Sequence, residues 1–195
     1  GKITPKTVQS NTDHSWKDSS VSMRINTEGI VDRVVTGVYN QDKNEKIIVR
    51  IRTPRVPIVG DKFSSRAGQK GTIGMTLHND DMPFTEDGMR PDIIINPHAV
   101  PSRMTMSQLL EMLVGKVAVH EGSEIDGTPF MGLTVESIQE KLREYGYDEH
   151  GETTMYSGFT GEKLQAKIFM GPMFYQRLKH MVADKIHTRS KGPRQ

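Results

Sequence analysis

Two runs rich in β-branched residues, separated by a polar turn, constrain the fold of this chain more than any other feature. The runs are GIVDRVVTGVY at 29–39 and KIIVRIR at 46–52, and the turn NQDKN at 40–44 lies between them. β-branched side chains pack well on a pleated surface, and two such runs joined by a short turn are typical of an antiparallel hairpin. The sequence therefore predicts a β-hairpin over 29–52.

A segment with two prolines, Thr53–Pro57, follows this hairpin. Proline has no backbone N–H group and ends strands, so we place a domain boundary here. The prediction is a first unit that contains the hairpin and a second domain that begins after this segment. Residues 6–28 contain few apolar positions and no helical period, and we expect a loop there.

The second domain combines helix and strand signals. One helix is predicted to begin after Thr105 and end before Gly122, and another to begin after Thr134 and end before Gly146. Thr105 and Gln108 have the spacing of a capping box. Strands are expected at 70–76, 93–95 and 164–170, and a third amphipathic segment with helical spacing is expected after Gly171 and Pro172, with one face formed by Phe174, Leu178, Met181 and Val182. The predicted fold class is mixed, α+β.

Positive charge is concentrated near the carboxyl end of the sequence. The chain has 26 Lys and Arg against 24 Asp and Glu, a formal net charge of +2. Residues 177–195 hold six Lys or Arg and one acid, a charge of +5, which leaves −3 for the other 176 residues. A basic segment favours a polyanion partner such as nucleic acid. The alternative is a solvated tail that contributes only to solubility.

Several classes of site are excluded by composition and spacing. The sequence has no cysteine, which removes disulfide frameworks, cysteine zinc sites and thiol nucleophiles, and a reducing compartment is expected. The 7 histidines form no His-Glu-x-x-His motif. His180 and His187 would share a helical face, but two histidines without a carboxylate partner are a poor set of zinc ligands. No apolar run reaches the ~18 residues of a membrane helix, and Gly1–Pro5 has no apolar signal core. We therefore predict no metal site and no membrane partner.

The glycine-rich segment 60–74 is the first candidate for chemistry. Its glycines alternate with Asp61, Lys62, Arg66 and Lys70, and glycine lets backbone N–H groups approach a phosphate closely. Gly-Lys-Ser/Thr does not occur, so the segment is not a Walker loop. Two readings stay open: a phosphate-facing loop, and a tight surface turn in which the glycines serve backbone geometry alone.

Arg103 is the second candidate. It follows Pro97 and Pro101 and precedes the helix predicted after Thr105, and a guanidinium beside a helix amino terminus binds anions well. On spacing alone, a structural salt bridge at Arg103, with Ser102 as a secondary cap, explains these residues slightly better than an anion site does.

Four long strings give the sequence a specific resemblance. They are GDKFSSRAGQKG at 60–71, DMPFTEDG at 81–88, PDIIINPHAVPSRMT at 91–105 and YQRLKHMVADKIHTRSKGP at 175–193. They closely resemble the second-largest, β-type subunit of multisubunit DNA-directed RNA polymerases. The resemblance covers nearly the whole chain and extends to GKITP at 1–5, EGIVDRV at 28–34 and MYSGFTGEKL at 155–164. His98-Ala99 and Thr105 resemble the archaeal, eukaryotic and large-DNA-virus branch.

The resemblance implies a layout and a set of site residues. Residues 1–55 would form the end of the wall (flap) domain, and 56–195 the distal part of the hybrid-binding domain, built around a double-psi β-barrel with helical additions. It implies that Lys62 and Lys70 approach the RNA 3′ end and nucleotide phosphates, that Arg103 contacts the incoming triphosphate, and that His180 lies near the initiating nucleotide. Weaker carry-overs place Gln69, Lys185, His187 and Arg189 along the RNA–DNA hybrid, as hybrid-binding residues, or along the active-centre wall.

The implied function is a share in DNA-templated RNA synthesis. This part would hold the RNA–DNA hybrid and position nucleoside triphosphate at an active centre shared with the largest subunit, which would supply the ligands for Mg²⁺. The implied partners are the largest subunit, the remaining parts of the second-largest subunit, template DNA, the hybrid and nucleoside triphosphates. The chain alone would be inactive, and its location would be intracellular: nucleus, archaeal cytoplasm, or a viral factory or virion.

The sequence also departs from the family pattern. Ala67 stands where the family commonly has histidine, and Thr188 where alanine is usual. The upstream lobe and protrusion regions, the first half of the barrel and the clamp-anchoring segment have no counterpart here. The alternative is therefore a free-standing, polymerase-derived nucleic-acid-binding or regulatory module without catalytic activity.

Overall fold

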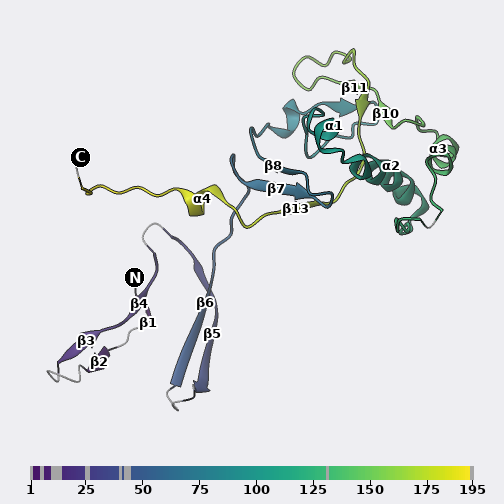
Figure 1. Ribbon diagram of the computed structural model, residues 1–195. Coiled ribbons are helices and arrows are strands. Elements are labelled where there is room, and N and C mark those ends of the chain that lie inside the picture. The colour runs from purple at the N-terminus through teal and green to yellow at the C-terminus, as the bar shows by residue number, and fades with distance from the viewer. Residues whose placement is uncertain are drawn as a thin grey trace. The chain divides into compact units, whose positions relative to one another are not determined.

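The computed structural model describes residues 2–193 except 5–6, 10–14, 25–26, 40, 42–44 and 131. The chain forms two compact units, Gly1–Val56 and Pro57–Gln195 (Figure 1). Strands and helices occur together, which confirms the mixed α and β class. Within the described ranges, no helix is both long and apolar enough to cross a membrane.

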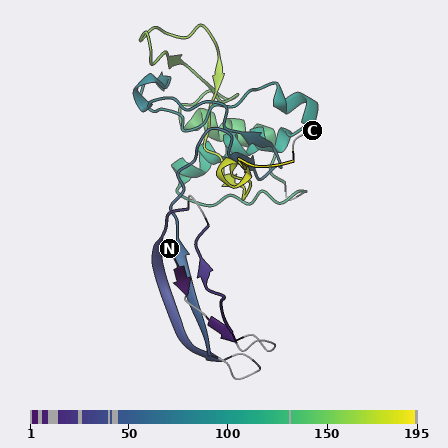
Figure 2. The same cartoon turned by 90° about the vertical axis from the view of Figure 1, so that its left-hand side faces the viewer.

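An antiparallel hairpin dominates the first unit, as predicted. Strand β5 (Ile30–Tyr39) pairs with β6 (Glu45–Arg52), and the two form the long ribbon seen in Figure 2. The register shifts between Val35 and Val38, and Gly37 lies in this bulge with a φ of 75°. Glycine is favoured at such a position because it adopts the left-handed region without steric cost. The turn predicted at 40–44 lies outside the described residues except for Gln41.

Short strands replace the loop expected at 6–28. The strands within this region are β2 (Thr7–Gln9), β3 (Trp16–Asp18) and β4 (Val21–Ser22), and β1 (Lys2–Thr4) precedes it. β1 pairs with β4 and β2 pairs with β3, each antiparallel. The loop prediction is wrong at β2, β3 and β4, because backbone pairing satisfies N–H and C=O groups without requiring an apolar period. Residues 6, 10–14 and 25–26 of the predicted loop lie outside the described part.

A three-stranded antiparallel sheet in the order β13-β7-β8 lies in the second unit. Its strands are β7 (Lys62–Ser65), β8 (Lys70–Thr72) and β13 (Tyr175–Arg177). Two-stranded sheets pair β9 (Phe84–Thr85) with β11 (Met155–Tyr156), and β10 (Glu152–Thr153) with β12 (Ile168–Phe169). The strands predicted at 70–76 and 164–170 are thus present in shortened form. The described strands form separate sheets and close no barrel.

Both predicted helices are present in the second unit. They are α2 (Met106–Glu121) and α3 (Val135–Glu144), and the shorter helices are α1 (Ala99–Arg103), the 3₁₀ helix η1 (Asn79–Asp81) and α4 (Val182–Lys185). The Thr134 hydroxyl accepts a hydrogen bond from the Ser137 N–H at 3.3 Å, which caps α3 as predicted. Gly122 and Gly146, with φ of 63° and 79°, follow α2 and α3 in the left-handed conformation that ends a helix.

Helices α2 and α3 lie side by side (Figure 1), and their apolar faces pack against each other. The buried cluster between them consists of Val117, Ile138 and Leu142, and Leu113, Val114 and Ile125 pack around it. This contact explains the helical periodicity of both segments, because each helix buries one apolar stripe.

Two other predictions are wrong. Ile93, Ile94 and Ile95 form no strand, and their exposed fractions are 47%, 62% and 39%. A strand depends on a partner, and no described segment of this chain pairs with them. The segment after Gly171 is not a long helix but forms strand β13 and the four-residue α4, because β7 offers backbone partners to Tyr175–Arg177.

We expect Leu142→Ala to lower the free energy of unfolding by roughly 2–5 kcal/mol, because it removes a fully buried side chain and leaves a cavity between α2 and α3. Leu142 has an exposed fraction of 0%. A urea titration followed by the helical circular dichroism signal measures the change. Leu110→Ala on α2, where the side chain is 39% exposed, is the matched control. An equal loss in both variants would contradict the assigned core.

Candidate functional site

The sheet β13-β7-β8 is the scaffold of the candidate site. Lys62 of β7 pairs with Thr72, and Ser64 pairs with Lys70 of β8. Side chains of opposed residues in an antiparallel pair point to the same face, and positions two apart on one strand share a face. Lys62 and Lys70 therefore lie on one face of the sheet as diagonal neighbours.

His180 is brought to this sheet by the end of β13. The Lys62 N–H group donates to the His180 carbonyl at 3.4 Å, and the Leu178 N–H group donates to the Lys62 carbonyl at 2.9 Å. The backbone of His180 is thus adjacent to Lys62, and its side chain is exposed. The polymerase-like strings at 60–71 and 175–193 meet here, although they are far apart in the sequence.

Arg103 contacts β8, the edge strand that lies across β7 from β13. Its Nη1 donates to Gln69 Oε1 at 2.8 Å and lies 3.5 Å from the Lys70 carbonyl. Arg103 is the last residue of α1, and Met104 follows it with a φ of 51°. Among the described residues, no carboxylate pairs with Arg103, so the structure does not show the salt bridge that spacing alone favoured.

Gln69 connects the turn after β7 with the helices α1 and α2. Its exposed fraction is 9%, and its Nε2 donates to the Ala99 carbonyl at 2.9 Å and to the Thr105 hydroxyl at 2.7 Å. The sequence signalled Gln69 as a hybrid contact, but not these contacts with Ala99, Thr105 and Arg103. The amide therefore fixes the segment that carries Arg103.

The capping box predicted at Thr105 and Gln108 is wrong. The Thr105 side chain makes no capping hydrogen bond to α2, because its hydroxyl accepts from Gln69 instead. Gln108 is 1% exposed, its Oε1 accepts from the Ser65 hydroxyl at 3.4 Å, and its Nε2 has no partner among the described residues. The amino end of α2 therefore lies beside Arg103 without a side-chain cap, a favourable environment for an anion.

The connection between β7 and β8 is a tight turn. The Gly68 N–H donates to the Ser65 carbonyl at 3.2 Å, and Gly68 has a φ of 78°. Arg66 pairs with Glu111 of α2 at 2.6 Å, which ties the turn to the helix. At Gly68 the glycine serves backbone geometry, and approach of this loop to a phosphate stays a prediction.

A buried carboxylate anchors the start of α4. Asp61 has an exposed fraction of 1%, pairs with Arg177 Nη2 at 2.7 Å, and accepts from the Val182 N–H at 3.1 Å. The Val182 hydrogen bond and the bond and charge of Arg177 hold the pKa of Asp61 below its ordinary value, against the effect of burial. Gly60, with a φ of 96°, leaves room for Val182, since an added Cβ would lie 2.4 Å from its Cγ2 atom.

This anchor was missed by sequence reasoning. Asp61 and Arg177 are 116 positions apart, and no local pattern relates them. Their juxtaposition follows from the pairing of β13 with β7, in which Arg177 lies opposite Phe63.

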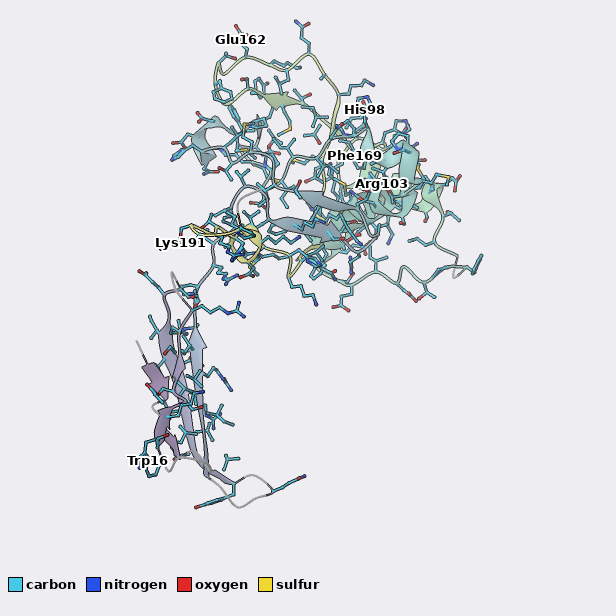
Figure 3. All side chains as sticks on the ribbon, turned by 60° about the vertical axis from the view of Figure 1, so that its left-hand side comes forward. Trp16, His98, Arg103, Glu162, Phe169 and Lys191 are labelled. Carbon is cyan, nitrogen blue, oxygen red and sulfur yellow. The ribbon has the colours of Figure 1, made fainter. Side chains whose placement is uncertain are left out.

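The basic residues at the end of α4 and after it lie outside the sheet β13-β7-β8. Lys185 ends α4, and His187 and Arg189 follow it as exposed residues in a segment without helix or strand. Figure 3 shows Lys191 of the same segment well apart from Arg103. His180 and His187 do not share a helical face, because α4 begins only at Val182.

The structure thus gathers Lys62, Lys70, Arg103 and His180 around one sheet, and we call these four residues the basic patch. Within the described part of the chain, no carboxylate forms an ion pair with Lys62, Lys70 or Arg103. Also within that part, no group of three or more His, Cys, Asp or Glu is placed to hold a metal ion. The arrangement is suited to binding an anion with several charged oxygens, such as a phosphate chain.

Comparison with known proteins defines the class to which this site belongs. The family model described as RNA polymerase Rpb2, domain 6, matches residues 2–195. The chain belongs to this family, which confirms the resemblance to second-largest polymerase subunits.

Named relatives come from several lineages. Over 200 residues the chain is 52% identical to DNA-directed RNA polymerase II subunit RPB2 of Encephalitozoon cuniculi, with 100% of the chain covered. It is 49% identical over 195 residues to DNA-directed RNA polymerase subunit 2 of Acanthamoeba polyphaga mimivirus, again with 100% covered. It is 45% identical over 177 residues to DNA-directed RNA polymerase subunit Rpo2 of Saccharolobus solfataricus, with 91% covered. The chain spans only 17%, 16% and 16% of these relatives' lengths.

We expect Asp61→Asn to reduce stability at neutral pH and to flatten its dependence on acid. Because the pKa of Asp61 in the folded chain lies below its ordinary value of 3.8, ionised Asp61 stabilises the fold above that value. This contribution is lost as the pH falls below 3.8 through the folded pKa. Thermal unfolding midpoints between neutral pH and about pH 2 measure the effect.

The matched control for this prediction is Asp80→Asn, which changes an exposed carboxylate in surface ion pairs. The difference between wild type and Asp61→Asn should shrink in acid, whereas Asp80→Asn should follow wild type throughout. Parallel acid profiles for wild type and Asp61→Asn would contradict the anchoring role.

Proposed function

We propose that this chain is the part of a second-largest RNA polymerase subunit that positions nucleotide phosphates and the RNA–DNA hybrid during DNA-templated RNA synthesis. The basic patch is the observation that carries the proposal, because it joins four cationic or titratable side chains from three distant segments around one sheet. Family membership over residues 2–195 supports the same assignment.

The chemistry of nucleotidyl transfer fits this patch. Negative charge spreads over phosphate oxygens during the reaction, and cations held in place beforehand stabilise it without reorganising. In this proposal Arg103 contacts the triphosphate, Lys62 and Lys70 contact phosphates near the RNA 3′ end, and His180 lies near the initiating nucleotide. Lys62, Lys70 and Arg103 would touch phosphate and His180 would lie beside the nucleotide, so the four would be catalytic residues of the assembled enzyme.

The exposed basic segment after α4 suits a different role. An RNA–DNA hybrid is recognised through its charged backbone and its shape rather than by reading bases. Lys185, His187 and Arg189 are exposed and accessible to such a backbone. We assign hybrid contacts to these three residues.

The proposal extends to the layout of the whole subunit. Residues 1–55 would form the end of the wall domain and 56–195 the distal hybrid-binding domain. The sheet β13-β7-β8 would contribute to a double-psi β-barrel that other parts of the subunit complete. The relatives named above are about six times as long as this chain, so their sequences are long enough to contain the parts that would complete the barrel.

Magnesium and the remaining partners would come from outside this chain. The described residues offer no cluster of three or more potential ligands, so they do not fit a magnesium site, and we assign its ligands to the largest subunit. The chain would act with that subunit, the rest of its own subunit, template DNA, the hybrid and nucleoside triphosphates, inside a cell or virion. By itself it would be inactive.

We expect Arg103→Ala in the assembled polymerase to lower kcat/KM for nucleotide incorporation by roughly 10²-fold or more, as loss of a fixed electrostatic stabiliser commonly does. Single-nucleotide extension of a preformed RNA–DNA scaffold measures it. Arg143→Ala is the control, because Arg143 is an exposed arginine of α3 paired with Glu149. Unchanged kinetics in Arg103→Ala would remove Arg103 from the proposed role.

We expect Lys62→Ala and Lys70→Ala to weaken use of the initiating or incoming nucleotide, because each removes a cation from the shared face of the sheet. The yield of short abortive RNA products as a function of nucleotide concentration measures this effect. Lys163→Ala, at an exposed lysine that forms an isolated antiparallel bridge with Tyr156, is the control. Normal abortive synthesis in both lysine variants would count against the phosphate contacts.

A further inference from the structure

We infer that Gln69 is a positioning residue that orients Arg103 toward the triphosphate while leaving the arginine's charge unneutralised. This inference rests on the proposed function, because it assigns Gln69 a role in the same site. It differs from the hybrid contact that the family resemblance implies for Gln69.

The hydrogen bonds of the Gln69 amide define one orientation. Nε2 donates to the Ala99 carbonyl at 2.9 Å and to the Thr105 hydroxyl at 2.7 Å, while Oε1 accepts from Arg103 Nη1 at 2.8 Å. A flipped amide would set its NH₂ group against the guanidinium and its oxygen against the Ala99 carbonyl. Both contacts would be repulsive, because a guanidinium only donates and a carbonyl only accepts.

Burial of the Gln69 side chain stabilises this orientation of its amide, because little water can replace the hydrogen bonds. Gln69 is 9% exposed, and both donors and the acceptor of its amide already have partners inside the protein. A direct contact with a nucleic-acid phosphate would have to use Nε2, because phosphate oxygens accept hydrogen bonds, and one of the two Nε2 bonds would then have to break. Arg103 is exposed, so its remaining N–H groups are accessible to a ligand.

The chemical type of the partner distinguishes Arg103 from three arginines of the same unit that are paired with carboxylates. Arg66 pairs with Glu111, Arg143 with Glu149, and Arg177 with Asp61. A carboxylate at such a distance cancels much of the positive field, whereas an amide oxygen fixes the guanidinium and leaves its full charge. Gln69 thus provides orientation without neutralisation, which is the requirement for a cation that must bind a polyphosphate.

Preorganisation links this contact to catalysis. A flexible arginine loses rotamer freedom when it binds, and holding it beforehand reduces that cost. Gln69 is also followed directly by Lys70, whose carbonyl lies 3.5 Å from Arg103 Nη1. One side chain therefore sets the spacing between two members of the basic patch.

The test uses the assembled polymerase with Gln69→Met, Arg103→Ala and the double variant, and measures kcat and KM for single-nucleotide incorporation. Gln69→Met preserves volume but removes all three hydrogen bonds. We expect it to lower kcat/KM about tenfold alone and to have no further effect in the Arg103→Ala background, because the two residues act as a unit. Gln165→Met, at an exposed glutamine, is the matched control and should match wild type.

A second variant and a structural readout complete the test. Gln69→Glu keeps size and an acceptor but places a negative charge beside Arg103, and we expect a similar loss of kcat/KM from neutralisation. The half-life of the elongation complex in high salt, which reports hybrid contacts, should not change in Gln69→Met. A structure of the Gln69→Met enzyme should show Arg103 displaced from the position that it holds in wild type.

The outcomes separate this inference from the proposed function. Losses that multiply in the double variant, or a shortened elongation-complex half-life, would indicate a direct hybrid contact and overturn the inference. An Arg103 side chain that keeps its position in Gln69→Met would overturn it as well. Normal kinetics in Arg103→Ala would instead overturn the proposed function, whatever the position of Arg103 in Gln69→Met.

Discussion

The candidate site depends on the backbone pairing of strand β7 on both of its edges. β8 pairs along one edge and β13 along the other, so a four-residue strand joins segments that the sequence separates widely. Each end of β7 is then fixed by a buried side chain. Asp61 precedes the strand and holds Arg177 and the start of α4, while Gln69, in the turn that follows, holds Arg103. Without this pairing, the basic patch would be four unrelated side chains.

The two buried side chains illustrate different uses of charge. Asp61 is ionised and is compensated by Arg177 and by backbone N–H groups, an arrangement that fixes position and leaves little net field. Gln69 is neutral and adds no charge of its own. The first device therefore suits a structural anchor, and the second suits a site in which positive charge must stay available.

Local sequence patterns predicted those features whose causes are local. The β5–β6 hairpin follows from β-branched runs, and α3 follows from its apolar stripe, the Thr134 cap and Gly146. The Thr105 capping box failed because a tertiary partner, Gln69, lies 36 positions away and takes the same hydroxyl. Ile93–Ile95 failed for a related reason, since strand formation requires a partner that the local pattern does not supply. Short-range rules thus hold until a long-range contact competes for the same polar group.

The same distinction applies to the site. Motif resemblance named Lys62, Lys70, Arg103, His180 and Gln69 one by one, and register and hydrogen bonds relate them to each other. Spacing alone slightly favoured a salt bridge for Arg103. Its actual partner is an amide in a turn 34 positions earlier in the sequence, which local spacing does not reveal.

Under the proposed function, the phosphate-binding cations and the metal-binding acids would come from different subunits. The basic patch supplies positive charge without paired carboxylates in the described residues, and those residues provide no cluster of acids for a metal ion. Nucleotidyl transfer requires both phosphate-binding cations and metal-binding acids in one place. If both sets were carried by one flexible surface, the acids would neutralise the cations before a substrate arrived. Under the proposed function the acids would lie on the largest subunit, which would avoid that cancellation and would make activity conditional on assembly.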